Sequence, residues 1–190
     1  RMNAAGRRAL GMGFVPEERL GRGAVPELSL AFNVLLSHQT PATVRHGMVR
    51  FKAIAAIAAS VIQRFNVKAA GPHAAANSLS GGNLQKYIFG REILRAPTML
   101  LVAQPTWGVD VGASAQIRAE LLALRDAGCA LLVISEELDE LFDIADRLIV
   151  IAKGRVSPPV ARADATIEQI GQWMSGLWTD AGKEVAHAQA

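Results

Sequence analysis

The spacing of the hydrophobic residues changes along the chain, and the first clear period is helical. Over about residues 27–71, apolar residues recur mainly at the spacings of three and four that mark one face of a helix. They are Leu28, Phe32, Leu35 and Leu36, and then Phe51, Ile54, Ile57, Ile62 and Phe65. A polar loop, residues 40–47, separates the two groups. The pattern predicts a helical subdomain.

After residue 76 the pattern alternates between helices and short apolar runs. Helices are predicted over about residues 82–95, 113–128 and 138–145, and TMLLVA, ALLVI and RLIVI are predicted as strands. Runs that are apolar on both faces are typical of buried parallel strands. A further short strand is predicted over residues 11–15, and a last amphipathic helix near residues 167–177. The alternation predicts an α/β fold with a parallel sheet, right-handed crossovers and helices on its faces.

Composition narrows the classes of function. The 190 residues suffice for one sizeable domain, or for a domain with a subdomain. The net charge is +3 and the basic residues are scattered among acidic ones, which favours a solvated surface over a nucleic-acid site. The single cysteine, Cys129, fits a small buried residue. The histidines His38, His46, His73 and His187 show no metal-ligand spacing, so no metal site is predicted.

The most informative stretch is NSLSGGNLQKYIFGREILRAP, residues 77–97. Ser80, Gly81 and Gly82 stand directly before a predicted helix. They would supply a hydroxyl cap and unobstructed backbone N–H groups at the positive end of the helix dipole, which suits a phosphate. An ordinary capped helix start fits these three residues equally well.

A second stretch, LLVAQPTWGVD, is a predicted strand that runs into a loop. Enzymes of the α/β nucleotide class usually place acidic residues for magnesium and water at such a strand end. Here the two positions hold Ala103 and Gln104. A methyl group cannot bind magnesium, and a neutral amide is a poor general base.

Together these motifs resemble those of ATP-binding cassette (ABC) ATPases, in the branch that energises the import of simple sugars and nucleosides. The signature LSGGN is followed in family order by QPTWGVDVGA, LLVISEELDEL and ADRLIVIAKGRV, and RRALGMGFVPEERLGRG precedes it. The resemblance covers about residues 7–176 and corresponds to the C-terminal part of the second cassette of a tandem-cassette ATPase. It implies a P-loop NTPase-like cassette with an inserted helical subdomain.

The resemblance also implies a division of the chain. Residues 1–26 would end the first part of the ATPase core and include the Q-loop region, and residues 27–76 would form the helical subdomain. Residues 77–156 would hold the signature helix, the Walker B strand, the D-loop and the switch region, and residues 157–190 a C-terminal helix and tail. The N-terminal phosphate-loop portion is expected to be absent, since no G-x-x-x-x-G-K-S/T motif occurs and the chain begins at Arg1 without an initiator methionine.

In the family, two cassettes face each other head to tail with two ATP molecules between them. On that template Ser80, Gly81 and Gly82, followed by Asn83, would touch the γ-phosphate of ATP held by the partner cassette, and Asp110 would contact the opposite cassette. The residues with which a family member binds and hydrolyses its own ATP are replaced in this chain. The Walker B carboxylates correspond to Ala103 and Gln104. The switch histidine corresponds to Glu136 and the Q-loop glutamine to Glu17. Trp107 replaces a family arginine and has no assigned role.

The resemblance therefore implies energy coupling in an importer. This chain would supply its signature motif in trans to the ATP site of the partner cassette, whereas its own ATP site would be degenerate. The full-length ATPase would use ATP and Mg²⁺, while this chain alone would bind neither and hydrolyse negligible ATP. Expected partners are another cassette, a membrane permease and, indirectly, a solute-binding protein, at the inner face of a bacterial membrane. The alternatives are a non-hydrolysing cassette that only supports dimer assembly, and a DNA-repair ATPase, against which the lack of coiled-coil heptads argues. The solute is not encoded in this chain.

Overall fold

The computed structural model describes residues 2–178, which fall into two compact units. The first unit extends to Ile134 and the second begins at Ser135. Each unit is described by itself.

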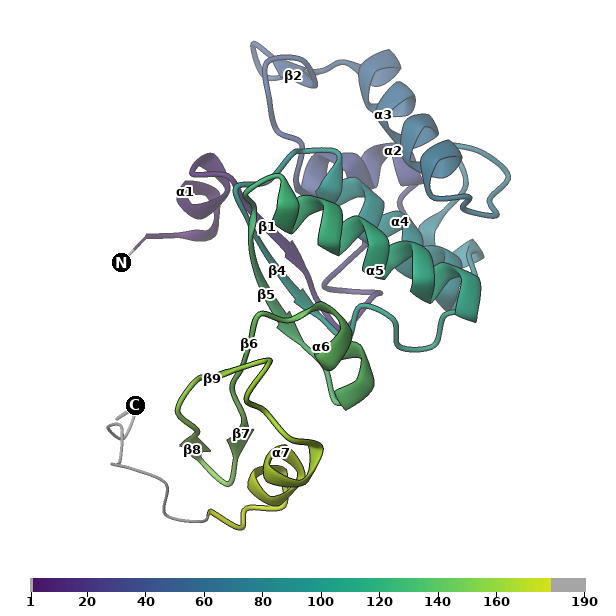
Figure 1. Cartoon of the computed structure of the whole chain (residues 1–190). Helices are drawn as coiled ribbons and strands as arrows, with labels where there is room; N and C mark the ends of the chain where they lie inside the picture. The colour runs from purple at the N-terminus through teal and green to yellow at the C-terminus, as the bar shows by residue number, and fades with distance from the viewer. Residues whose placement is uncertain (1, 179–190) are drawn as a thin grey trace. The chain divides into compact units, whose positions relative to one another are not determined.

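The first unit is built on a parallel three-stranded sheet (Figure 1). Its strands are β1 (Met12–Val15), β4 (Met99–Ala103) and β5 (Ala130–Ile134), in the order β1-β4-β5. One face of the sheet carries the fully buried side chains of Val15, Leu100 and Val102. Helices α4 (Gly81–Ile93) and α5 (Val111–Asp126) lie on this side of the sheet (Figure 1). The predicted α/β class with a parallel sheet is confirmed.

The opposite face of the sheet is apolar but open to solvent. Phe14, Met99, Leu132 and Ile134 are 40, 39, 45 and 51% exposed. The sequence predicted helices on both faces, whereas α4 and α5 share one face. Both crossovers, β1 to β4 and β4 to β5, step in the same direction along the sheet, and right-handed crossovers in one direction place their helices on the same side.

The helical subdomain is less regular than its hydrophobic spacing predicts. It contains α2 (Leu30–Asn33), the 3₁₀ turns η1 (Val34–Leu36) and η2 (Ala76–Ser78), and the longer helix α3 (Phe51–Arg64). The predicted loop holds a small antiparallel hairpin, β2 (Val44–Arg45) with β3 (Met48–Val49). Its turn residues His46 and Gly47 both have positive φ, which two-residue hairpin turns require. Helix α1 (Ala4–Ala9) was also missed, because none of its residues is buried and no apolar stripe marks it.

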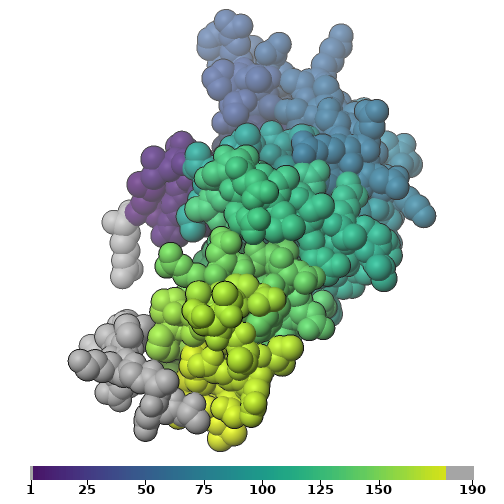
Figure 2. All heavy atoms as spheres, viewed as in Figure 1, coloured from purple at the N-terminus to yellow at the C-terminus, as the bar shows by residue number. Residues whose placement is uncertain are grey.

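Helix α4 is the centre of the first unit. Every residue from Leu84 to Ile93 is buried, and its packing against the subdomain is close at Gly90, where a Cβ atom would lie 2.3 Å from the Phe65 ring. At the surface, Arg64 at the end of α3 pairs with Glu120 of α5 at 2.7 Å. In Figure 2 the blue surface of the subdomain adjoins the teal surface of the segments that follow it. The subdomain and the sheet therefore share one core.

The second unit contains α6 (Leu138–Ile144), α7 (Ile167–Met174) and two antiparallel strand pairs. Strand β6 (Arg147–Leu148) pairs with β9 (Val160–Ala161), and β7 (Ile151–Ala152) pairs with β8 (Arg155–Val156). The prediction of RLIVI as one buried strand of the parallel sheet was wrong. Leu148 and Val150 are buried against Ile170 and Trp173, whereas Ile149 and Ile151 are exposed, so the run alternates like a one-sided ribbon. Within residues 2–178, no helix combines the length and apolarity needed to cross a membrane.

Candidate functional site

The first turn of α4 leaves backbone donors available. Ser80 has the extended backbone of an N-cap residue, but its side chain caps no backbone N–H, so the predicted hydroxyl cap was wrong. Instead the Ser80 Oγ accepts a 2.9 Å hydrogen bond from Asn83 Nδ2. Among residues 2–178 the N–H groups of Gly81, Gly82 and Asn83 have no hydrogen-bond acceptor. Such groups at the positive end of a 13-residue helix suit an anion.

Asn83 also fastens this turn to the preceding loop. Its Oδ1 accepts from the backbone N–H of Lys68 at 2.8 Å. One turn further along the helix, Lys86 Nζ donates to the carbonyl of Asn66 at 2.7 Å. The signature motif, Ser80 to Asn83, is thus held from one side by residues 66–68.

The loop of residues 105–110 lies against the signature motif from another side. A Cβ atom on Gly82 would lie 3.4 Å from the carbonyl oxygen of Gly108, an ordinary van der Waals contact, so the loop lies directly against the signature motif. At the end of the loop Asp110 is exposed and caps α5, where its Oδ1 accepts from the N–H of Ala113 at 2.9 Å. That hydrogen bond, aided by the charge of Lys86, lowers the pKa of Asp110. The structure thereby brings Asp110 and the signature glycines to one surface.

The end of β4 carries no acidic side chain. Ala103 and Gln104 are half-buried, and the Gln104 N–H donates to Ile134 O at 2.7 Å. Glu17 is exposed in the loop after β1, and Glu136 is exposed in the second unit. No group of three or more His, Cys, Asp or Glu residues in the described part of the chain is arranged to hold a metal ion. Ala103 and Gln104 therefore do not fit a magnesium site at the end of β4, because neither side chain is a carboxylate.

Sequence reasoning missed Arg19, which reaches both the signature helix and the 105–110 loop. Its Nε donates to Gln85 Oε1 at 3.1 Å, and its Nη2 donates to the carbonyl oxygen of Trp107. The cation also lies 5.4 Å from the centroid of the Trp107 ring. These partners are 66 and 88 residues away in sequence, so no local pattern could indicate them.

A buried polar cluster supports α4 from the subdomain side. His38 Nε2 donates to the carbonyl oxygen of Arg91 at 2.8 Å, and burial lowers the pKa of His38. Arg91 pairs with Glu92 at 3.0 Å, with side-chain exposures of 4 and 1%.

His46 and His73 are exposed, and His187 lies outside the described residues. Cys129 is buried, as predicted, and burial raises the pKa of its thiol.

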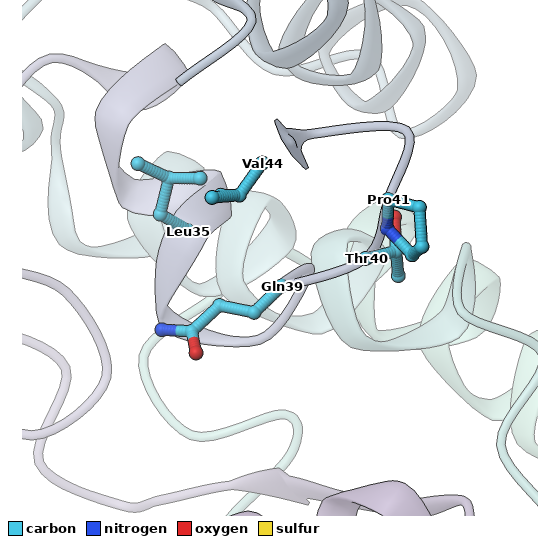
Figure 3. Close-up of a pocket in the computed structure, with 5 residues that line it drawn as sticks. All are labelled: Leu35, Gln39, Thr40, Pro41 and Val44. Carbon is cyan, nitrogen blue, oxygen red and sulfur yellow. The ribbon is translucent and has the colours of Figure 1, made fainter. Parts of the chain in front are cut away.

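A cavity of about 530 Å³ lies in the helical subdomain (Figure 3), and neither the signature motif nor Asp110 lines it. Its lining residues are Leu35, Gln39, Thr40, Pro41 and Val44. None of these side chains is charged, and two of them, Gln39 and Thr40, are polar.

Comparison with known proteins gives consistent matches. No family model matches the chain. The chain is 41% identical over 166 residues to the nucleoside import ATP-binding protein NupA of Lactococcus lactis, covering 87% of this chain and 33% of that protein. It is 37% identical over 175 residues to the guanosine import ATP-binding protein NupO of Bacillus subtilis, covering 91 and 34%. Further relatives are named for glucose, xylose or ribose import.

The chain thus spans about a third of the length of the curated relatives it matches. Among solved structures, a dimeric ATP-binding cassette in a post-hydrolysis state with ADP and phosphate matches with a TM-score of 0.63 at 19% identity. That match covers 80% of this chain and 62% of the cassette. The fold is that of an ABC cassette.

Proposed function

Because this chain is homologous to the ATP-binding proteins of sugar and nucleoside importers and has the ABC cassette fold, we propose that it supplies a signature motif in trans. In this proposal Ser80, Gly81, Gly82 and Asn83 bind the γ-phosphate of ATP held by a partner cassette. The chain's own site, at Ala103 and Gln104, does not hydrolyse ATP.

The observation that carries the proposal is the set of unpaired N–H groups at Gly81, Gly82 and Asn83. A side-chain cap at Ser80 would occupy one of them, and the bond from Asn83 draws the Ser80 hydroxyl away from that role. Neither glycine places a side chain between the backbone and an approaching phosphate. Preorganised donors of this kind stabilise charge that develops during phosphoryl transfer.

The degenerate site in cis is supported by the chemistry at the end of β4. The Ala103 methyl group offers no ligand to magnesium, and the neutral Gln104 amide is a poor base for an attacking water. Glu136, at the position of the switch histidine, carries a negative charge that would repel a γ-phosphate. Ala103, Gln104 and Glu136 all disfavour hydrolysis at the chain's own site. In this proposal ATP is therefore hydrolysed at the site built on the partner cassette.

Asp110 supports assembly with that partner. It is exposed beside the signature motif, and its capping bond uses one carboxylate oxygen, Oδ1. The second oxygen can therefore accept a hydrogen bond from an opposing cassette. The proposed partners are such a cassette, a membrane permease contacted through residues 27–76, and indirectly a solute-binding protein on the far side of the membrane. The proposed location is the cytoplasmic face of the membrane.

The solute stays open between sugars and nucleosides, because the relatives are named for both classes. None of the described motifs contacts a solute in the proposed arrangement, so solute choice would reside in the permease and the binding protein.

The test is the steady-state ATPase activity of the complete transport protein that contains this chain, with Ser80→Ala. We expect kcat to fall by roughly 100-fold, the typical effect of deleting one preorganised donor. Ser175→Ala is the matched control, since Ser175 is exposed in the second unit and its hydroxyl donates to the nearby carbonyl of Gln172. Unchanged turnover in Ser80→Ala would remove the signature from catalysis and favour a cassette that only supports assembly.

A further inference from the structure

We propose that Arg19 is a positioning residue that holds the signature motif and the 105–110 loop in one fixed arrangement, with Trp107 as its partner. This inference rests on the proposed function, because it concerns how the trans site keeps its shape. It also gives Trp107 a role.

The guanidinium of Arg19 joins three separate segments of the first unit. Its own backbone belongs to the loop after β1, its Nε donates to Gln85 of α4 at 3.1 Å, and its Nη2 donates to the Trp107 carbonyl. The Trp107 ring lies 5.4 Å from the same cation, within the range of a cation–π contact. Gln85 is 1% exposed and extends the connection, because its Nε2 donates to Pro105 O at 3.2 Å.

Two glycines lie directly against this side chain. A Cβ atom on Gly81 would lie 2.7 Å from Arg19 Nη1, so a side chain at this position would displace the guanidinium. A Cβ atom on Gly108 would lie 3.4 Å from Nη2, which is an ordinary van der Waals contact. The guanidinium therefore fills the space between the signature motif and the loop. Glycine at position 81 serves the arginine as well as the phosphate.

Arg19 is engaged inward rather than towards a ligand. Two of its three nitrogens donate to protein acceptors, and its flat face lies over the Trp107 ring. Burial lowers its pKa, which agrees with a partly desolvated cation. The planar guanidinium donates to Gln85 and to the Trp107 carbonyl at the same time. The ammonium group of a lysine is a point charge and cannot reproduce this geometry.

The arrangement matters because the signature N–H groups and Asp110 must meet the partner cassette together. Their relative position depends on contacts between residues far apart in sequence, and Arg19 and Gln85 supply polar contacts among them. A displacement of about 1 Å in a positioning contact can cost roughly 100-fold in rate.

The experiment compares Arg19→Ala, Arg19→Lys, Trp107→Ala and Trp107→Phe in the complete transport protein. Arg22→Ala is the control, because Arg22 lies in the same loop, is 76% exposed and pairs with Glu18. We expect kcat to fall by roughly 100-fold in Arg19→Ala, with the KM for ATP within about twofold, since ATP is bound by the partner's phosphate loop. Trp107→Phe keeps an aromatic face and should retain most activity, and adding Trp107→Ala to Arg19→Ala should cause little further loss.

Arg19→Lys separates positioning from direct phosphate binding. A positioning role requires the fork, so lysine should restore less than about tenfold of the lost kcat. Recovery of nearly full activity by lysine would overturn the proposal in favour of a charge contact with phosphate.

Hydrogen exchange in the same protein gives a readout that is independent of turnover. Exchange at the hydrogen-bonded amides of Leu84, Trp107 and Val109 should accelerate in Arg19→Ala and stay unchanged in Arg22→Ala. Unchanged exchange and kcat in Arg19→Ala, with activity lost in Ser80→Ala, would overturn this inference and leave the proposed function standing. Intact activity in Ser80→Ala would instead refute the proposed function, and the exchange data would then decide the role of Arg19 alone.

Discussion

The side-chain amide of Asn83 donates to the hydroxyl oxygen of Ser80 across 2.9 Å, within the first turn of α4. Serine at the start of a helix usually caps a backbone N–H two or three residues ahead. Here the Ser80 oxygen accepts from Asn83 and caps no backbone N–H, so the helix start keeps its donors unpaired. The same residue fixes the turn to Lys68 through its Oδ1.

Substitution of Asn83 should therefore damage catalysis in a definite order. In Asn83→Ala the Ser80 hydroxyl is free to cap the helix, which occupies a donor meant for phosphate. Asn83→Asp keeps an acceptor for Lys68 but adds a negative charge beside the γ-phosphate. We expect kcat/KM of the complete protein to fall in both variants and further in Asn83→Asp, by about tenfold or more relative to Asn83→Ala. Equal activity of Asn83→Asp and wild type would contradict a phosphate at this position.

Gln104 should be dispensable for turnover. It has a positive φ of 49°, so asparagine, which tolerates this conformation, is the mildest substitution. If the site in cis does no chemistry, the ATPase rate of Gln104→Asn in the complete protein should stay within about twofold of wild type. A loss of several orders of magnitude, as expected for removal of a group that activates water, would show that Gln104 takes part in hydrolysis.

The buried ion pair behind α4 should be far more sensitive than a surface pair. Arg91→Met keeps much of the side-chain volume but leaves Glu92 buried without its nearest cation, and the remaining partner, Arg95 Nη1, lies 3.8 Å from Glu92 Oε2. We expect a loss of about 3 kcal/mol in the free energy of unfolding, measured by urea denaturation. Arg22→Met, at the exposed pair with Glu18, should cost less than about 1 kcal/mol. Similar losses in the two variants would contradict the burial of the Arg91 pair.

His38 should make stability depend on pH. Burial lowers its pKa in the folded protein, so the unfolded chain binds more protons between the folded pKa and the unfolded value of about 6.5. The free energy of unfolding should therefore be full above about pH 6.5 and decrease as the pH falls below it. His38→Gln keeps a donor for the Arg91 carbonyl and should remove this part of the pH dependence. An unchanged pH dependence of the free energy of unfolding in His38→Gln would contradict this prediction.

Much of the fold could be predicted from the sequence because its signals are local. The apolar runs gave β4 and β5, and the helical spacing of Ile117 and Leu121 gave the buried face of α5. RLIVI failed because a run that is apolar throughout does not reveal which side chains are buried, and alternate residues of it are exposed.

The site was predictable in its residues and less so in its contacts. The position of Ser80 directly before a helix followed from local sequence, whereas the N-cap role of Asp110 was not predicted, because that helix was expected to begin near residue 113. The loss of the Ser80 cap to Asn83 is a competition between two acceptable hydrogen bonds, which sequence alone does not rank. Arg19 was missed because its partners depend on how the chain folds back over more than 60 residues.

The central claim is that this chain completes a partner's ATP site and performs no hydrolysis at its own. The most direct measurement is the number of ADP molecules trapped with vanadate per complete two-cassette protein. We predict one ADP per protein for the wild type and for Ser175→Ala, and none for Ser80→Ala. Two trapped ADP molecules in the wild type, or one retained in Ser80→Ala, would contradict the account.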